Sequence, residues 1–182
     1  MRTSVLGHST VRSTNPAEFA ENRPSFFADP VAWQFAAAIG QALQPHHATV
    51  LANPDDVAII TMSEHATLLT MQAVATTAQR GRVSPLRFAG SNPGATTGLP
   101  CIRWGLRGPS LALSTTPAAA APTALTVADS WLTRGLARFL VLAGHTLDDT
   151  GTHEVQCVVA RHPLTTHDIH PLITGRGAAD AG

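Results

Sequence analysis

The chain has 182 residues, with twelve basic and twelve acidic side chains and a formal net charge of zero. Its hydrophobic content of 44% excludes a disordered chain, and its charged content of 13% is well below the ~25% of an ordinary domain. All twelve basic residues are arginines scattered along the sequence, so the basic face that binds nucleic acid is not expected.

The compartment follows from what the sequence lacks. The longest apolar runs are far shorter than the ~20 residues of a membrane helix. Residues 1–13 lack the apolar core of a secretory signal. Two cysteines, Cys101 and Cys157, make no disulfide framework. We therefore expect a cytoplasmic protein with no membrane partner.

The first half of the chain alternates between predicted strands and helices. Residues 3–8 predict a short strand, followed by a polar loop that reaches Asp29. Asp29 can cap a helix over 30–44, which starts with proline and has apolar residues at helical spacing. The run VAIITM, residues 57–62, predicts a buried strand, and 64–80 predict the next helix.

The second half continues the alternation. A long ordered loop is expected over 80–98, which is rich in glycine, proline and serine. Beyond it the apolar runs predict helix 95–104, strand 110–115, helix 117–134, strand 137–144 and strand 153–161. This order indicates an α/β domain with a largely parallel sheet. We expect one domain over 1–162 and a flexible tail over 163–182.

The helix predicted over 117–134 is unusually apolar. Thr116 can cap it, Pro117 suits its first position and Gly135 can end it. Residues 117–128 contain no charge, whereas a surface helix normally carries a polar face. This helix should therefore be buried on nearly every side. Either other helices of the chain or a second chain could cover it, and the low charge content favours a second chain.

The stretch 81–116 resembles the segment of β-ketoacyl synthases that leads to their active site. In that family, R-x-S-P-x-x-F is followed by N-x-x-A-G, a short helix, G-L-x-G-P-S, a strand and then T-A-C at a corner. The chain supplies, in order, Arg82, Ser84, Pro85, Phe88, Asn92, Gly98, Gly105, Leu106, Gly108, Pro109 and Ser110. The resemblance covers roughly residues 50–160. It implies a thiolase-like half domain, with a mixed, mainly parallel five-stranded sheet and helices on both faces.

The resemblance puts a proline where the family has its nucleophile. The family's cysteine lies at a helix start, whose positive end stabilises a thiolate. That position falls on Pro117, with Thr116 and Ala118 as neighbours. Proline has neither a nucleophile nor the backbone N–H that helps stabilise the family's oxyanion. The family's catalytic histidines and lysine belong to its second half, which is not matched. The resemblance thus predicts a non-catalytic, truncated ketosynthase-like protein that uses no cofactor.

The resemblance also implies partners. The family dimerises through the strand before the corner, here Leu111, Ala112, Leu113, Ser114 and Thr115, and through the loop around Asn92. We expect a homodimer, or a heterodimer with a ketosynthase-type protein, in polyketide or fatty-acid biosynthesis. An acidic acyl carrier protein is a further candidate partner. Its contacts would be Arg80, Arg82, Arg87, Arg103 and Arg107, which could equally be ordinary solvated surface.

An enzymatic alternative stays open from the residues alone. A split or small acyltransferase or thioester hydrolase could use Thr115, Thr116 or Cys101, or a residue from a partner chain. A lone threonine needs an adjacent base, however, and a cysteine in a helix is more often a small buried hydrophobe. The adjacent residues Ser63, Glu64 and His65 could contribute to a triad, but such combinations are common in any sequence.

The remaining candidates favour structural roles. His162, His167 and His170 could bind a metal with Asp168, but their spacing matches no metal motif, and we expect a polar tail without metal. His46 and His47 are adjacent in a loop and would point apart. Cys157 lies in a predicted strand and is expected to be a buried hydrophobe. Asn92 is expected to order its loop through backbone hydrogen bonds.

Overall fold

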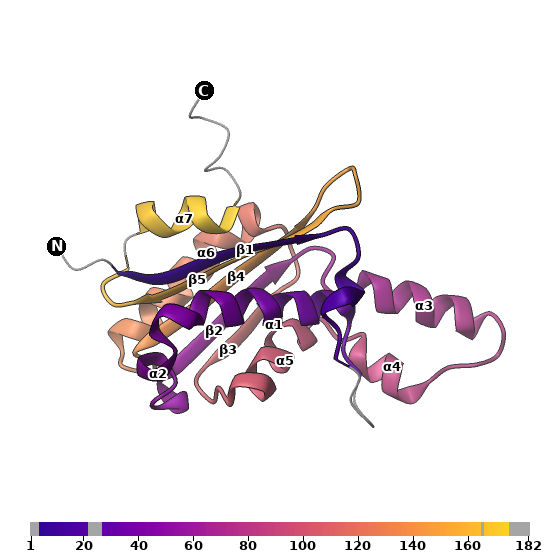
Figure 1. The fold of residues 1–182 in the computed structure, drawn as a ribbon, viewed down its shortest axis with the longest axis horizontal. Helices are drawn as coiled ribbons and strands as arrows, with labels where there is room; N and C mark the ends of the chain where they lie inside the picture. The colour runs from indigo at the N-terminus through magenta and orange to yellow at the C-terminus, as the bar shows by residue number, and fades with distance from the viewer. Residues whose placement is uncertain (1–3, 22–26, 165, 175–182) are drawn as a thin grey trace.

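The computed structural model of the chain describes residues 4–21, 27–164 and 166–174. A five-stranded sheet lies between helices on both faces (Figure 1). The strands are β1 (Val5–Ser13), β2 (Val57–Ser63), β3 (Ser110–Leu113), β4 (Phe139–Leu147) and β5 (His153–Arg161). The longer helices are α1 (Pro30–Leu43), α3 (Leu68–Ala78), α5 (Ala95–Trp104), α6 (Pro117–Thr133) and α7 (Thr166–Thr174). Shorter helical segments are Pro16–Phe19, Gln44–His46, α2 (His47–Val50), Pro54–Asp56 and α4 (Pro85–Gly90).

The sheet is mixed, as predicted. Its strand order is β1-β5-β4-β2-β3. The central strand β2 runs parallel to both β3 and β4, whereas β5 runs antiparallel to β4 and β1. Four strands therefore point the same way. Their carboxyl ends meet at one edge of the sheet, where α/β folds usually bind ligands.

Alternating side chains of the strands build two cores. On one face Ile59 and Val141 join Phe35 and Ile39 of α1. On the other face Ile60, Leu142 and Val158 join the helices α6 and α7, and these core residues are fully buried. This period-two pattern explains why β2 and β4 read as continuous apolar runs, because both of their faces are covered.

The predicted helix starts are confirmed at α1 and α6. Asp29 Oδ1 accepts a hydrogen bond from Val31 N at 2.8 Å, and Thr116 Oγ1 accepts one from Ala119 N at 3.3 Å. Both helices begin with proline, which lacks the N–H that a first turn leaves unpaired. Gly135, with φ of +71°, ends α6 as predicted.

Two predicted segments near the N-terminus and middle of the chain differ from the structure. The first strand is not limited to 3–8 but extends to Ser13, because its polar residues alternate on the exposed side of an edge strand. The loop expected over 80–98 contains the helix α4. Ser84 caps α4 and Pro85 is its first residue, a pair that is typical of a helix start. The glycine, proline and serine residues around this pair favour a loop instead.

The flexible tail expected from residue 163 is wrong for Thr166–Thr174. These residues form α7, which packs beside α6 on the sheet. Ile169 and Ile173 lie four residues apart, on one side of the helix, and both are fully buried. The proline and histidine content of the segment hid this apolar stripe. Residues 175–182, the rest of the expected tail, lie outside the described residues.

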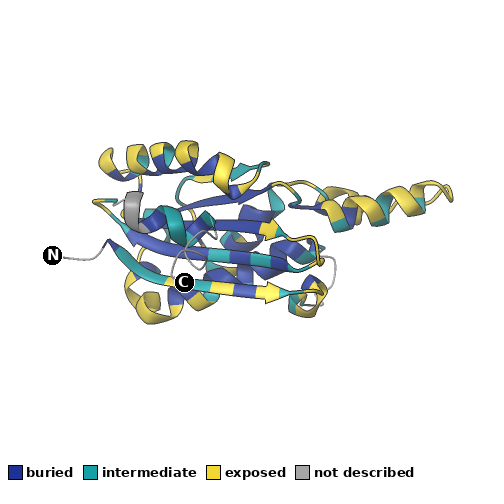
Figure 2. Ribbon diagram, turned by 90° about the horizontal axis from the view of Figure 1, so that it is seen from above, coloured by how far each residue is buried: buried dark blue, intermediate teal, exposed yellow. Residues whose placement is uncertain are grey.

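The helices α3 and α4 form an arm that projects from the end of the sheet (Figures 1 and 2). We call residues 64–94 the arm. The helix α3 begins at Leu68, later than predicted, and Thr70 is its only buried member. In the part of the chain that the structure describes, no helix is both long and apolar enough to cross a membrane.

Candidate functional site

The corner between β3 and α6 is occupied by Pro117, the residue that the resemblance places at the family's nucleophile position. Pro117 is buried, and its ring lies against Gly144 at the carboxyl end of β4. A Cβ atom added to Gly144 would lie 3.0 Å from Pro117 Cβ and Cγ and 2.8 Å from the Ile173 carbonyl oxygen. Glycine is therefore needed where β4, α6 and α7 meet. The corner is a packing contact between three elements.

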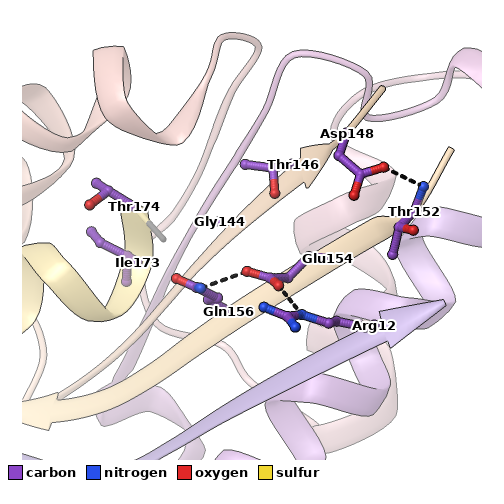
Figure 3. A pocket seen from close by; sticks show the side chains of 9 residues that line it. All are labelled: Arg12, Gly144, Thr146, Asp148, Thr152, Glu154, Gln156, Ile173 and Thr174. Carbon is purple, nitrogen blue, oxygen red and sulfur yellow. Dashed lines mark hydrogen bonds and ion pairs between the residues drawn. The ribbon is translucent and has the colours of Figure 1, made fainter. Parts of the chain in front are cut away.

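A polar cavity of about 480 Å³ opens beside this corner (Figure 3). It lies at the carboxyl end of β4, on the face of the sheet that carries α7. Its lining residues are Arg12, Gly144, Thr146, Asp148, Thr152, Glu154, Gln156, Ile173 and Thr174. No local sequence pattern marks this cavity, because its residues come from three strands, the turn between β4 and β5, and the helix α7.

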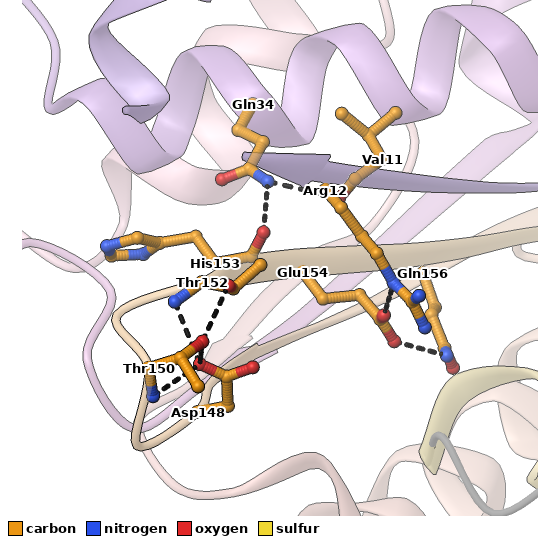
Figure 4. A network of polar contacts seen from close by, with 9 residues as sticks. All are labelled: Val11, Arg12, Gln34, Asp148, Thr150, Thr152, His153, Glu154 and Gln156. Atoms are coloured by element: carbon orange, nitrogen blue, oxygen red, sulfur yellow. Dashed lines mark hydrogen bonds and ion pairs between the residues drawn. The ribbon is translucent and has the colours of Figure 1, made fainter. Parts of the chain in front are cut away.

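The charges in the polar cavity pair with one another (Figure 4). Arg12 Nε on β1 contacts the carboxylate of Glu154 on β5, and Gln156 Nε2 donates to Glu154 Oε1 at 2.6 Å. Arg12 and Glu154 face each other because their residues are paired in the β1–β5 ladder. The Arg12 side chain is 67% exposed and that of Glu154 is 16% exposed, so this pair contributes little to stability.

Asp148 at the rim orders the turn between β4 and β5. Its Oδ1 accepts hydrogen bonds from Thr150 N at 2.9 Å, from the Thr150 hydroxyl at 2.6 Å and from Thr152 N at 2.8 Å. The bond from the Thr150 hydroxyl, followed by that from Thr152 N, holds the pKa of Asp148 below its ordinary value. Asp148 is thus an ionised turn-forming residue and a poor general base.

The polar cavity lacks a nucleophile paired with a base. Among its described lining residues the hydroxyls belong to Thr146, Thr152 and Thr174, and none of its residues is a cysteine, histidine or lysine. The nearest histidines in sequence, His145 and His153, point to the opposite face because side chains alternate along a strand. The arrangement suits binding of polar groups better than covalent chemistry.

On the opposite face, Ser63 and two histidines form a buried chain. Ser63 Oγ lies 2.7 Å from His145 Nδ1, and His145 Nε2 lies 3.0 Å from His153 Nδ1. Ser63 therefore pairs with His145 from β4, and no hydrogen bond joins its side chain to Glu64 or His65 within the described chain. Ser63 is 2% exposed and His145 is 1% exposed, which leaves a substrate no access.

The buried chain has unusual acid–base properties. Burial, followed by the charges of His153 and His65, lowers the pKa of His145 to about 3. Burial also lowers the pKa of His153, although the nearby carboxylate of Asp29 opposes this shift. Both histidines are therefore neutral at pH 7.

Asp29 links the arm to the domain. Besides capping α1, its Oδ2 accepts a hydrogen bond from Thr70 N of α3 at 2.9 Å. The residue is completely buried, and desolvation raises the pKa of its carboxyl above the ordinary value. The sequence predicted the cap, but the second bond depends on a residue that lies 41 positions further along the chain.

The predicted interface residues lie at a free edge and on an exposed loop. β3 is an edge strand that pairs only with β2 within the described chain, so Leu111, Ala112 and Leu113 keep one open side. Thr115 is half-buried and Ser114 is exposed. Asn92 is exposed, and its Oδ1 accepts a hydrogen bond from Gly94 N at 2.7 Å, which orders the loop as expected.

Within the described chain the helix α6 is open on one side, so the burial on nearly every side that its composition predicts would require a second chain. Its inner side packs on the sheet and α7 through Ala121, Ala124 and Ala128. Its outer side exposes Ala118, Ala119, Pro122, Thr123 and Thr126. We call these five residues the outer face of α6. No described residue of the chain buries them.

The five arginines proposed for carrier-protein contact do not form one patch. Arg103 pairs with Glu21 at 2.6 Å, and Arg107 Nε binds Asp55 Oδ1 at 2.7 Å. The remaining three lie on the arm. Arg87 lies 5.5 Å from the ring centroid of Phe27, whereas Arg80 and Arg82 line a surface cavity of about 420 Å³ with Thr77.

The cysteines and the remaining histidines form no reactive site among the described residues. Cys101 is half-buried and Cys157 is fully buried, and burial raises the pKa of both thiols, which disfavours the nucleophilic thiolate. His47 packs edge-on against Trp104. The described residues contain no group of three side chains that could hold a metal ion. The side chains of His167 and Asp168 lie outside the described residues.

No protein-family model and no curated protein matches the chain. Solved structures do. The ishigamide ketosynthase/chain length factor superposes with a TM-score of 0.68 at 12% identity, over 88% of this chain and 62% of that one. A type II PKS acyl-carrier protein in complex with its ketosynthase gives 0.66 at 14% identity, over 91% and 63%. A ketosynthase in complex with its chain length factor from Xenorhabdus doucetiae gives 0.56 at 17% identity, over 74% and 58%.

These similarities establish the fold. The chain has the thiolase-like α/β fold of ketosynthases, with its five-stranded mixed sheet, as the resemblance predicted. It spans less than two thirds of the length of the similar chains. Within this fold Pro117 is the first residue of α6, the helix that follows the corner after β3. That the family's nucleophile belongs at this position stays a prediction of the resemblance.

Proposed function

We propose that this chain is a non-catalytic ketosynthase-like protein that acts as a binding or assembly partner in polyketide or fatty-acid biosynthesis. The observation that carries the proposal is the contact between Pro117 and Gly144. Proline at 117 leaves neither a thiol nor a backbone N–H at the first position of α6.

The surroundings of the corner support the same function. Thr116 uses its hydroxyl to cap α6, so this oxygen accepts a hydrogen bond from Ala119 N and has no base beside it. Thr115 has no hydrogen-bond partner for its side chain among the described residues. The polar cavity next to the corner offers paired charges and hydroxyls instead of a nucleophile.

The partner in this proposal is a ketosynthase-type protein or a second copy of the chain. The outer face of α6 carries no charge, and β3 presents unpaired backbone groups along a free edge. Large apolar side chains are exposed on and beside the arm, namely Leu68, Met71, Val83, Leu86, Phe88 and Ile102. An apolar cavity of about 300 Å³ lies among residues of α4 and α5. Surfaces of this kind are typical of protein interfaces.

An acyl carrier protein is a second candidate partner within the same function. Among the arginines named for it, Arg82 and Arg87 on the arm have no carboxylate partner among the described residues. Arg103 and Arg107 would first have to release Glu21 and Asp55. We therefore place the main carrier contact on Arg82 and Arg87.

Light scattering tests the proposal on the purified chain, alone and after co-expression with ketosynthases from the same genome. A stable homo- or hetero-oligomer is expected, together with a change in the partner's activity or product length. A folded monomer that binds no ketosynthase would contradict the partner role.

Thioester assays test the non-catalytic role separately. The isolated chain is expected to give no acyl transfer or thioester hydrolysis above background. Turnover that disappears in T115A, T116A or C101A would replace the proposal with the enzymatic alternative.

A further inference from the structure

A second cavity with polar groups lies at the other end of the β4–β5 hairpin. Its volume is about 330 Å³. In the β4–β5 ladder Phe139 pairs with Arg161 at this end, whereas Leu147 pairs with His153 at the end that borders the polar cavity. None of the residues used in the proposed function lines this second cavity, which we call the basic cavity.

The lining of the basic cavity combines cationic groups with an apolar surface. Arg138, Arg161 and His162 supply nitrogen donors, and no carboxylate is among its described lining residues. Leu132, Ala137 and Phe139 supply the apolar part, and all three are buried. Gly135 completes the lining without a side chain. This composition fits a ligand that has an anionic group and a small apolar part.

Within the described chain, one of the two arginines has no ion pair and the other has a long, exposed one. Arg161 makes no side-chain ion pair or hydrogen bond there. Arg138 Nη1 lies 3.8 Å from Asp56 Oδ2, too far for a hydrogen bond, and its side chain is 74% exposed. Arg103 and Arg107, by contrast, are held by carboxylates at 2.6 Å and 2.7 Å. The positive charge of the basic cavity is therefore available to a ligand.

The carboxyl-terminal end of α6 lies beside the basic cavity, and unpaired carbonyl groups at a helix end repel an anion. Three carbonyl groups of the last turn are hydrogen-bonded, however. The carbonyl oxygens of Ser130, Trp131 and Leu132 accept hydrogen bonds from Arg134 N at 3.0 Å, Leu136 N at 2.8 Å and Gly135 N at 3.2 Å. This arrangement reduces the repulsion that the helix end would otherwise exert.

We propose that the basic cavity binds the phosphate group of a small organic phosphate. Guanidinium groups bind phosphate through paired N–H donors, and two of them on adjacent strand ends can clamp one dianion. The guanidinium carbon of Arg138 lies 5.9 Å from the ring centroid of Phe139, which holds this side chain over the apolar surface. The organic part of the ligand would then contact Leu132, Ala137 and Phe139.

Calorimetric titration of the full chain with phenyl phosphate tests the site at constant ionic strength, with inorganic phosphate and chloride as comparisons. Saturable binding of one phenyl phosphate is expected, tighter than that of inorganic phosphate because of the apolar surface. R161Q and R138Q should each weaken binding about tenfold or more, as expected for loss of a charge-assisted hydrogen bond. R12Q, which removes an arginine that is paired with Glu154 at the opposite end of the hairpin, is the matched control and should bind like the unsubstituted chain.

Three results would overturn the proposal. They are the absence of saturable binding, unchanged affinity in both R161Q and R138Q, and an equal loss in R12Q, which would indicate nonspecific attraction to arginine. Thermal unfolding of each variant verifies that a lost affinity does not come from a lost fold. Because these residues lie outside the proposed partner surfaces, failure of phosphate binding leaves the proposed function intact.

Discussion

The ring of Pro117 and the backbone of Gly144 lie in direct contact toward the carboxyl end of β4. The contact needs both residues, since a side chain at 144 would collide with the proline ring and with the Ile173 carbonyl. The resemblance to ketosynthases predicts their nucleophile at this position, and here the position is filled by packing. The start of α6 keeps its cap and its helical geometry.

The contact predicts a large cost for a small substitution. In G144A the new methyl group would lie 2.8 Å from Ile173 O and 3.0 Å from the Pro117 ring. Since backbone oxygen cannot move freely, we expect a loss of about 1–3 kcal/mol in the free energy of unfolding, measured in urea. G98A in α5 is the matched control, because a Cβ there meets nothing within 4 Å. It should be neutral or stabilising, and equal losses in both variants would contradict the packing argument.

The same corner predicts a reactive but unproductive thiol. In P117C a cysteine would stand at the start of a helix, where the helix end favours the thiolate. It should react with iodoacetamide faster than Cys157, because both thiols would be buried but only the one at 117 would stand at a helix start. Acyl transfer should remain absent, because no histidine or lysine is among the described residues that line the polar cavity. Mass spectrometry measures the labelling, and acyl transfer by P117C alone would contradict this prediction.

The buried Ser63–His145–His153 chain predicts a loss of stability in acid. The folded-state pKa of His145 is about 3, below its ordinary 6.5, and that of His153 is also lowered. The unfolded state therefore binds more protons between these values, so stability is fully present above pH 6.5 and falls as the pH drops towards 3. Each histidine contributes a slope of up to about 1.4 kcal/mol per pH unit. Urea unfolding between pH 4 and 8 measures this slope.

Two variants separate the groups that titrate there. H145N should be less stable at pH 7 but less sensitive to acid, because one buried histidine is gone. Asp29 acts in the opposite sense, since its raised folded-state pKa gives stability that is lost as the pH rises through it. D29N keeps a capping side chain and removes this opposing effect. In this variant the free energy of unfolding should therefore fall more steeply as the pH drops below 6.5. If the free energy of unfolding of H145N fell with pH as steeply as that of the unsubstituted chain, His145 would not be the group that titrates.

Helices and strands whose ends are marked by neighbouring residues in the sequence were predicted correctly. Asp29-Pro30 and Thr116-Pro117 gave the starts of α1 and α6, because cap and proline are read from adjacent residues. The strand β5 was predicted at its observed bounds, 153–161. The same Ser84-Pro85 signal was available for α4 but was outweighed by loop-forming residues around it. The four-residue spacing of Ile169 and Ile173, both buried, indicates one side of a helix, whereas the proline and histidine content around them indicates a tail.

The candidate site could be located only in part. The ordered series of family residues gave the corner and its proline, because these positions follow one another in the chain. The polar cavity unites Arg12 with Glu154, and the buried chain unites Ser63 with His145. These pairs are separated by 142 and 82 positions. Only the strand order and register bring such residues together, and no local pattern encodes them.

The outer face of α6 carries the last prediction. In T123R a long charged side chain would stand on an exposed position of this face, so the isolated chain should keep its stability within about 0.5 kcal/mol. Any complex that buries the face should be lost, because an unpaired charge in an interface costs several kcal/mol. Q41R, on an exposed position of α1 in the opposite layer, is the control and should leave the complex intact. Light scattering measures the mass of the complex that each variant forms. A complex that survives T123R would mean that the partner docks elsewhere, and the free edge of β3 and the arm would then be the surfaces to substitute.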